Sequence, residues 1–109
     1  MVMRPDPSLF SALGDSTRLD LIERLQRVDA LATTELASGT GLTRQAVKKH
    51  LDVLAEAGLV HSTRSGRRRI WRLDTGPLMS MGTWAEHIRQ QWETRFDQLD
   101  ALLLSDQGA

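Results

Sequence analysis

The side chains in this sequence that could do chemistry are mainly cations, and most of them fall in one segment. Residues 43–73 hold eight Lys/Arg against two Asp/Glu, whereas residues 1–42 hold four against six and residues 74–109 hold two against six. The formal charge of the 109-residue chain is therefore zero although its middle is strongly basic. Such a block attracts phosphates whatever the base sequence, and acidic flanks keep the whole molecule near neutrality. The segment is a candidate contact surface for a polyanion.

Residues 43–58 are predicted to form a helix with a basic outer face. Thr43 is a good N-cap, and Gly58 can adopt the left-handed conformation that closes the other end. The opposite faces of this helix differ: an apolar stripe holds Val47, Leu51 and Leu54, and the polar side holds Gln45, Lys48, Lys49, Asp52 and Glu56. Taken alone, such a helix is more often a solvated surface than a binding site.

The preceding stretch, residues 33–42, favours the binding site over the solvated surface. It predicts a short capped helix and a tight turn, with Leu36, Ala37 and Leu42 available to pack inward. A helix, a short turn and a basic helix form a helix-turn-helix motif, in which the first residues of the second helix meet base edges and phosphates. The DNA contacts expected from this helix are Thr43, Arg44, Gln45, Lys48 and Lys49.

After Gly58 the hydrophobic period becomes alternating. Residues 59–64 and 67–73 predict two strands joined at Ser65-Gly66, with Trp71 and Leu73 on one face with Arg69. Arginines at a hairpin tip can be merely solubilising. Four within six residues, next to a basic helix, favour contacts with phosphates or the minor groove instead. The expected contacts of this wing are Arg64, Arg67, Arg68 and Arg69.

Composition excludes several other kinds of site. The chain has no cysteine, so disulfides, thiolate nucleophiles and cysteine metal sites are ruled out. His50, His61 and His87 lack the spacing of paired metal ligands, and no nucleophile–base set or phosphate-binding glycine loop is present. We therefore expect no enzyme, no catalytic residue, no cofactor and no metal site. The start lacks a signal-peptide pattern and no run is long enough for a membrane span, so we expect a cytoplasmic protein without a membrane partner.

Two short helices are predicted ahead of this motif. Residues 7–13 have an apolar side and end at Gly14, and residues 15–25 begin with capping residues and place Leu21, Ile22 and Leu25 at core spacing. Arg18 lies in the first turn of the second helix, where a cation is unfavourable to the helix dipole. Either an ion pair or an exposed side chain would explain it.

The C-terminal segment, residues 77–104, predicts one long helix with an apolar stripe. A helix of this length is about 40 Å long at 1.5 Å per residue, which exceeds what so small a domain can cover. We therefore expect a homodimer in which the stripe continues into a second subunit, although it could instead fold back on its own domain. The expected dimer contacts are Leu9, Phe10, Leu13, Trp84, Ile88, Trp92, Phe96 and Leu99.

Several stretches together resemble the ArsR-type (arsenic-repressor-like) winged-helix regulators. They are Leu13-Gly-Asp-Ser-Thr-Arg-Leu, Glu35-Leu-Ala, Gln45-Ala-Val-Lys-Lys-His-Leu-Asp-Val-Leu, Glu56-Ala-Gly-Leu-Val and Gly66-Arg-Arg-Arg-Ile-Trp-Arg-Leu. The resemblance covers about residues 7–104. At 109 residues the chain suits a single domain over residues 1–109. The resemblance implies a mainly α fold with a small β-hairpin, made of four helices, the two-stranded wing and a last helix, and a homodimer formed through the first and last helices. It also implies a bacterial repressor.

The sequence departs from the metal-sensing members of that family. They use cysteines near the third helix or an Asp/His/His/Glu set on the last helix, whereas this chain has Glu35-Leu-Ala and only His87 at those places. We expect His50 to pack or bond locally. The leading hypothesis is a homodimeric repressor that binds double-stranded DNA at an inverted repeat. One alternative is the same repressor released by a small apolar effector near Trp84, Ile88, Trp92 and Met79, and another is a protein-interaction module that has lost DNA binding.

Overall fold

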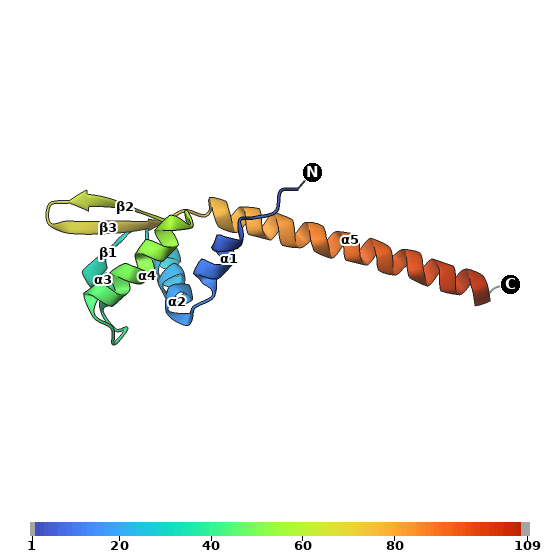
Figure 1. Cartoon of the computed structure of the whole chain (residues 1–109), viewed down its shortest axis with the longest axis horizontal. Helices are drawn as coiled ribbons and strands as arrows, with labels where there is room; N and C mark the ends of the chain where they lie inside the picture. The colour runs from blue at the N-terminus through green and yellow to red at the C-terminus, as the bar shows by residue number, and fades with distance from the viewer. Residues whose placement is uncertain (1, 108–109) are drawn as a thin grey trace.

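The computed structural model describes residues 2–107 (Figure 1). The described elements are α1 (Pro7–Leu13), α2 (Ser16–Arg27), β1 (Leu31–Ala32), α3 (Thr33–Ala37), α4 (Arg44–Glu56), β2 (Val60–Ser65), β3 (Arg68–Leu73) and α5 (Gly76–Gln107). The first four helices and the sheet lie together, and α5 leaves them as a rod, which gives the molecule extents of 76 × 29 × 22 Å. This order confirms the predicted fold class, a mainly helical winged helix-turn-helix.

The sheet differs from the prediction in two details. It has a third strand, because β1 pairs with β3 through Leu31↔Trp71 and Ala32↔Ile70. Two residues are too few to show an alternating pattern, so this strand could not be recognised in the sequence. The predicted turn was also wrong by one residue: Ser65 pairs with Arg68, so the turn residues are Gly66 and Arg67. Gly66 has a φ of 61°, as the first position of a two-residue II′ hairpin turn requires.

Side chains cap the helices where the sequence indicated. Thr43 Oγ1 accepts a hydrogen bond from the N–H of Ala46 at 3.1 Å, and Gly58 has a φ of 79° just beyond the end of α4. Asp15 Oδ1 accepts from the N–H of Arg18 at 3.1 Å at the start of α2, and this bond lowers the pKa of Asp15. These contacts satisfy backbone donors that the first turn of a helix leaves without partners.

The core lies between α2, α4 and the sheet. Its completely buried side chains include Leu21 of α2, Leu36 of α3, Leu51 of α4 and Trp71 of β3. Leu42, in contrast, is 39% exposed, so the expectation that it packs inward was wrong. It follows Gly41, whose φ of 74° reverses the chain just before α4.

Arg18 explains how α1, α2 and α4 are joined. Its guanidinium donates to the carbonyl oxygens of Ala12 at 2.6 Å and Ser11 at 3.4 Å, and Nη1 lies 3.2 Å from Nδ1 of His50. Hydrogen bonds to the end of α1, rather than an ion pair, therefore hold this cation in the first turn of α2. The local bonding predicted for His50 is confirmed.

Only the first turns of α5 rest on the body. Leu78 and Met81 pack against the core, and the ring of Trp84 meets Phe10 of α1 edge-on with centroids 5.5 Å apart. Every side chain described between residues 88 and 104 is exposed. None of the helices in the described chain is long and apolar enough to cross a membrane.

We expect Leu51→Ala to lower the free energy of unfolding by about 2–5 kcal/mol, because a fully buried leucine side chain leaves both lost contacts and a cavity. Val53 lies on the same helix but is 38% exposed, so Val53→Ala serves as the control and should cost less than about 1 kcal/mol. Urea titration followed by circular dichroism measures both. Equal losses for the two variants would contradict the placement of the core.

Candidate nucleic-acid interface

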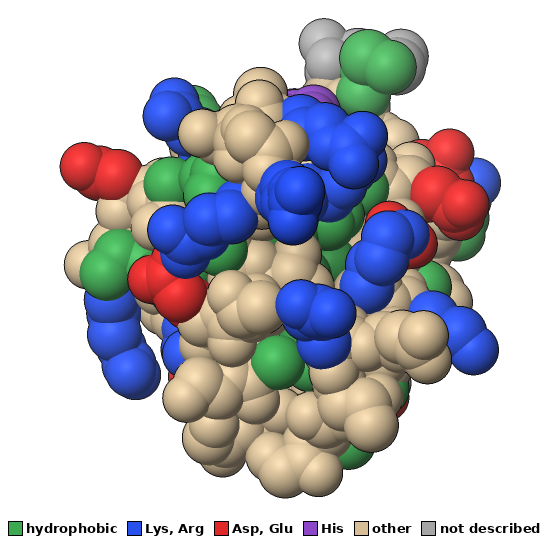
Figure 2. Space-filling view, turned by 90° about the vertical axis from the view of Figure 1, so that its left-hand side faces the viewer, with side chains coloured by type: hydrophobic (Ala, Val, Ile, Leu, Met, Phe, Trp, Pro, Cys, Tyr) green, Lys and Arg blue, Asp and Glu red, His purple; other side chains and the backbone are tan. Residues whose placement is uncertain are grey.

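A groove of about 310 Å³ lies between the start of α4 and the wing. Its lining combines three regions of the chain: Ala32, Thr33, Thr34, Arg44, Gln45, Lys48, Arg67, Arg68 and Arg69. Figure 2 views the end of the molecule that carries the hairpin tip and α3, and it shows Lys and Arg side chains gathered over the upper part of this face. The structure thus brings the cations of α4 together with those of the wing, although the nearest two of them, Lys48 and Arg67, are nineteen positions apart in the sequence.

The buried stripe of α4 determines which residues enter the groove. Val47 and Leu51 are completely buried, so Arg44, Gln45 and Lys48 are turned outward at the N-terminal end of the helix. Six of the nine predicted DNA contacts line the groove: Arg44, Gln45, Lys48, Arg67, Arg68 and Arg69. The other three, Thr43, Lys49 and Arg64, are exposed beside it, and the Thr43 hydroxyl is engaged as the cap of α4.

Some cations of this surface are paired with an acidic or polar side chain, and others are not. Lys48 Nζ lies 2.8 Å from Oδ2 of Asp52, and Arg68 Nη2 lies 2.6 Å from Oε1 of Glu35. Arg69 donates to the hydroxyl of Ser62 at 2.8 Å. Among the residues whose side chains the structure describes, no salt bridge involves Arg44, Lys49, Arg64 or Arg67. These four charges are therefore available to an incoming anion.

Two cations also face each other across the wing. Arg64 of β2 and Arg69 of β3 are directly paired in the hairpin register. Like charges at such positions destabilise a hairpin, and a bound anion removes that cost. The pairing is what a phosphate-binding hairpin would contain.

Residues of α3 were missed as part of this surface. Thr33 and Thr34 line the groove, and Thr33 Oγ1 accepts a hydrogen bond from Nε1 of the buried Trp71 at 2.8 Å. This bond attaches the base of the wing to the first helix of the motif. The missed β1 strand brings α3 beside β3, and nothing in the sequence indicated that strand.

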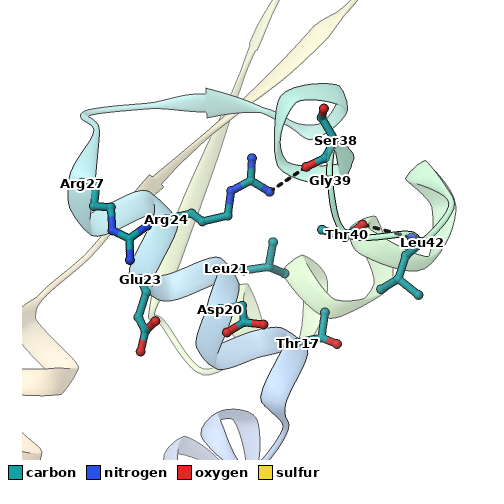
Figure 3. A pocket seen from close by; sticks show the side chains of 10 residues that line it. All are labelled: Thr17, Asp20, Leu21, Glu23, Arg24, Arg27, Ser38, Gly39, Thr40 and Leu42. Atoms are coloured by element: carbon teal, nitrogen blue, oxygen red, sulfur yellow. Dashed lines mark hydrogen bonds between the residues drawn. The ribbon is translucent and has the colours of Figure 1, made fainter.

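The turn between α3 and α4 is held by α2. Arg24 donates to the carbonyl oxygens of Glu35 at 2.7 Å and Ser38 at 3.3 Å, and also to that of Leu36. Figure 3 shows Arg24 extending from α2 toward Ser38, over a hollow of about 560 Å³. Thr40 closes the turn by donating to the carbonyl of Ala37 at 2.7 Å and accepting from the N–H of Leu42 at 3.1 Å. Several hydrogen bonds therefore hold the turn that leads from α3 into α4 against α2.

The predicted dimer contacts separate into two groups. Along α5, Ile88, Trp92, Phe96 and Leu99 are 49%, 61%, 53% and 53% exposed. At α1, Leu9 is only 5% exposed and belongs to the core of its own chain, so it was wrongly assigned to a dimer surface. Leu13 and Trp84 are half-buried, and Phe10 is 39% exposed. The exposed stripe thus belongs mainly to α5.

The set of residues named for an apolar effector does not converge. Met79 is thirteen positions from Trp92, which at about 100° per residue places the two on widely separated faces of α5. Met79 lines a different hollow, together with Gly82, Glu86 and His87. The ring of Trp84 is occupied by its contact with Phe10. These four side chains therefore do not share one face of α5 in the single chain, and an effector site near a dimer seam stays a prediction.

The histidines do not form a metal site among the described residues. His50 and His61 each have a local partner instead. His61 Nε2 lies 2.8 Å from Oδ2 of Asp74, whose Oδ1 accepts from the N–H of Gly76 at 2.9 Å. The backbone bond first, and His61 second, lower the pKa of Asp74. Among the side chains that the structure describes, residues 2–104, no three of His, Asp or Glu are grouped so that they could hold a metal ion.

Comparison with known proteins places this geometry in a family. Residues 13–63 match the family profile described as a helix-turn-helix domain. An uncharacterized HTH-type transcriptional regulator, YuzN of Bacillus subtilis (strain 168), is 39% identical over 80 residues, which are 68% of this chain and 87% of that protein. The arsenical resistance operon repressor of Escherichia coli (strain K12) is 25% identical over 96 residues, covering 87% of this chain and 79% of that one.

Solved structures agree with the sequence relatives. An ArsR-like transcriptional regulator from Rhodococcus sp. RHA1 superposes with a TM-score of 0.77 at 32% identity, covering 88% of this chain and 90% of that chain. The matched share of the chain is much larger than the helix-turn-helix profile at residues 13–63. The chain is a DNA-binding transcriptional regulator, not an enzyme, and it belongs to the ArsR-type family of winged helix-turn-helix regulators.

Proposed function

We propose that this regulator is a homodimeric repressor that binds an inverted-repeat operator in double-stranded DNA. The observation that supports it best is the groove in which the first turns of α4 and the arginines of the wing lie together. A regulator with this task works where the chromosome is, so we place it in the cytoplasm.

Helix α4 is suited to read bases. Arg44 and Gln45 occupy its first two positions after the Thr43 cap, and both side chains are exposed. In helix-turn-helix proteins these positions reach base edges in the major groove, where Arg pairs with guanine and Gln with adenine through two hydrogen bonds each. In this proposal, Arg44, Gln45 and Lys48 select the sequence.

The wing is suited to anchor the protein rather than to read. Arg67 is a residue of the turn, and Arg64 lies in β2 just before it. Both side chains are exposed, and neither makes a salt bridge to a described side chain. Contacts with phosphates, or with the adjacent minor groove, set register and affinity but carry little sequence information. We therefore assign Arg64 and Arg67 to affinity.

The stripe on α5 supports the homodimer. Ile88, Trp92, Phe96, Leu99 and Leu103 recur at steps of three or four, each about half exposed or more. The stripe continues the line of Leu78 and Met81, which pack on the core of the same chain. Exposed apolar patches of this extent mark interaction sites. Charged side chains lie along one flank, where Arg89 bridges Glu86 and Glu93.

A second copy would cover the stripe and pair two reading helices. Two-fold symmetry of a protein matches a palindromic operator, with half-sites about one helical turn, or 34 Å, apart. The Escherichia coli relative is named as a repressor, and an occupied operator that overlaps a promoter would act in that way. Repression is therefore the output we propose.

Mobility-shift assays with promoter fragments, followed by a reporter gene, test this function. We expect one fragment to be retarded in the presence of excess competitor DNA, and its promoter to be less active when the protein is present. Absence of a shift on every fragment would favour a protein-interaction module. Higher reporter activity in the presence of the protein would contradict repression.

We expect operator binding to be indifferent to metal ions, because the side chains near His87 and Glu35 do not form a ligand set among the described residues. Zinc, cadmium or arsenite titrated into the protein–operator complex should leave the bound fraction unchanged to within about twofold. A chelator should have no effect either. Release of DNA at a stoichiometric amount of metal would contradict this expectation.

A further inference from the structure

Glu35 is the carboxylate that stands beside the proposed DNA-binding groove. It occupies the third position of α3, and its Oε1 accepts two hydrogen bonds. One comes from the N–H of Ala32 in β1 at 3.1 Å, and the other from Nη2 of Arg68 in β3 at 2.6 Å. Through this one oxygen, α3 of the helix-turn-helix motif is bonded to the edge strand β1 and to the wing.

The backbone of Glu35 is held as firmly as its side chain. Its carbonyl oxygen accepts from Nη2 of Arg24 at 2.7 Å, and Arg24 also donates to Leu36 and Ser38. The next residue, Leu36, is completely buried. The backbone of Glu35 is therefore fixed relative to α2.

This pair joins α3 to the outer part of the wing. The bond from Trp71 to Thr33 attaches the buried base of β3, whereas Arg68 begins β3 next to the turn. Arg68 and Glu35 remain 58% and 49% exposed, so solvent weakens their attraction but a phosphate could reach the same arginine. Glu35 competes with DNA for Arg68.

We propose that Glu35 is a specificity-determining residue of the DNA-binding surface, because it withholds Arg68 from phosphates and joins the wing to α3. This inference rests on the proposed function. Phosphate neutralisation supplies most of the affinity for non-specific DNA, so one cation fewer weakens that affinity without touching the contacts to bases. Glu35 thereby raises the ratio of operator binding to non-specific binding.

The variant Glu35→Gln separates charge from shape. Glutamine retains an oxygen that can accept from the N–H of Ala32, but it no longer attracts Arg68 as a carboxylate does. Each additional phosphate contact steepens the slope of log affinity against log salt by about 0.9, so its contribution to affinity falls about threefold between 50 and 200 mM salt. We expect Glu35→Gln to bind a non-operator duplex more tightly than the wild type, with a slope steeper by about one, so that its advantage is about threefold larger at 50 mM than at 200 mM salt.

Arginine variants provide the matched controls. Arg67 makes no salt bridge to a described side chain, so Arg67→Gln should flatten the slope on non-operator DNA by about one. Arg68→Gln should change that slope by less than about half as much, because Glu35 already neutralises Arg68. The double variant Glu35→Gln, Arg68→Gln should return to the wild-type slope, since the released cation is gone.

The experiment measures fluorescence-anisotropy affinities of these four variants and the wild type, on operator and non-operator duplexes of equal length between 50 and 200 mM salt. An unchanged slope in Glu35→Gln, or an equal flattening in Arg68→Gln and Arg67→Gln, would overturn the inference while leaving the proposed function intact. A wild-type protein that binds both duplexes equally would overturn both. Equal thermal midpoints of wild type and Glu35→Gln would show that the change is electrostatic, whereas a large fall in the midpoint with no change in slope would show only a structural role.

Discussion

Replacing Trp92 and Leu99 by Asp will convert the protein from dimers to monomers. Both side chains lie on the exposed apolar stripe of α5, 61% and 53% exposed in the single chain. An unpaired carboxylate buried at the centre of a two-helix contact costs several kcal/mol, which exceeds the margin of most dimers of this size. Sedimentation of the wild type at micromolar concentration should give a dimer, and sedimentation of the double variant should give a monomer.

The loss of the dimer should appear in DNA binding as well. Two linked half-site contacts gain about 10²–10⁴ in affinity over one, so the monomeric variant should bind the operator at least 100-fold more weakly. Gln90→Asp with Ala101→Asp is the matched control, because these positions lie on the face of α5 away from the stripe and add as many carboxylates. The control should remain dimeric. A wild-type monomer, or monomers from both pairs of substitutions, would refute the role of the stripe.

Gln45→Ala and Arg67→Ala should weaken DNA binding in different ways. Gln45 is exposed in the first turn of α4, and losing a two-bond contact with adenine costs about 1–3 kcal/mol on the operator and relaxes one base position in each half-site. Arg67 lies in the turn of the wing, and its loss should weaken operator and non-operator DNA alike while flattening the salt slope by about one. Competition assays with operator variants at two salt concentrations measure both effects.

A control on the same helix separates these effects from misfolding. Glu56 is exposed at the far end of α4, so Glu56→Ala should leave base preference and salt slope unchanged. If Arg67→Ala altered base preference and Gln45→Ala lowered affinity uniformly, the roles of the reading helix and the anchoring wing would be reversed.

An element could be predicted from the sequence where its own residue pattern also determines which of its faces is buried. The apolar stripe of α4, its Thr43 cap and Gly58 specify a helix with one buried face, and the structure has that helix within the expected bounds. The alternating pattern on both sides of Gly66 likewise predicted the hairpin of the wing. In both elements the large apolar side chains are buried in the core, so the charged side chains on the opposite face point toward solvent.

Features that depend on contacts between distant residues could not be predicted. The strand β1 has two residues, and only its pairing with β3 makes it a strand. Arg24 has its role because α3 ends beside α2, and Arg68 lies 33 positions from the carboxylate that holds it. The sequence also cannot show that Leu9 is buried in the core of its own chain. The apolar face of α1 would suit a core and a dimer surface equally well.

Selection of binding sites from a pool of random duplexes, carried out with wild-type protein and with Gln45→Ala, tests the central claim most directly. If paired α4 helices read DNA, the wild type will enrich an inverted repeat with half-sites about one helical turn apart, and Gln45→Ala will lose preference at one position in each half. Enrichment of an unrepeated site, no enrichment at all, or an identical motif from both proteins would contradict it.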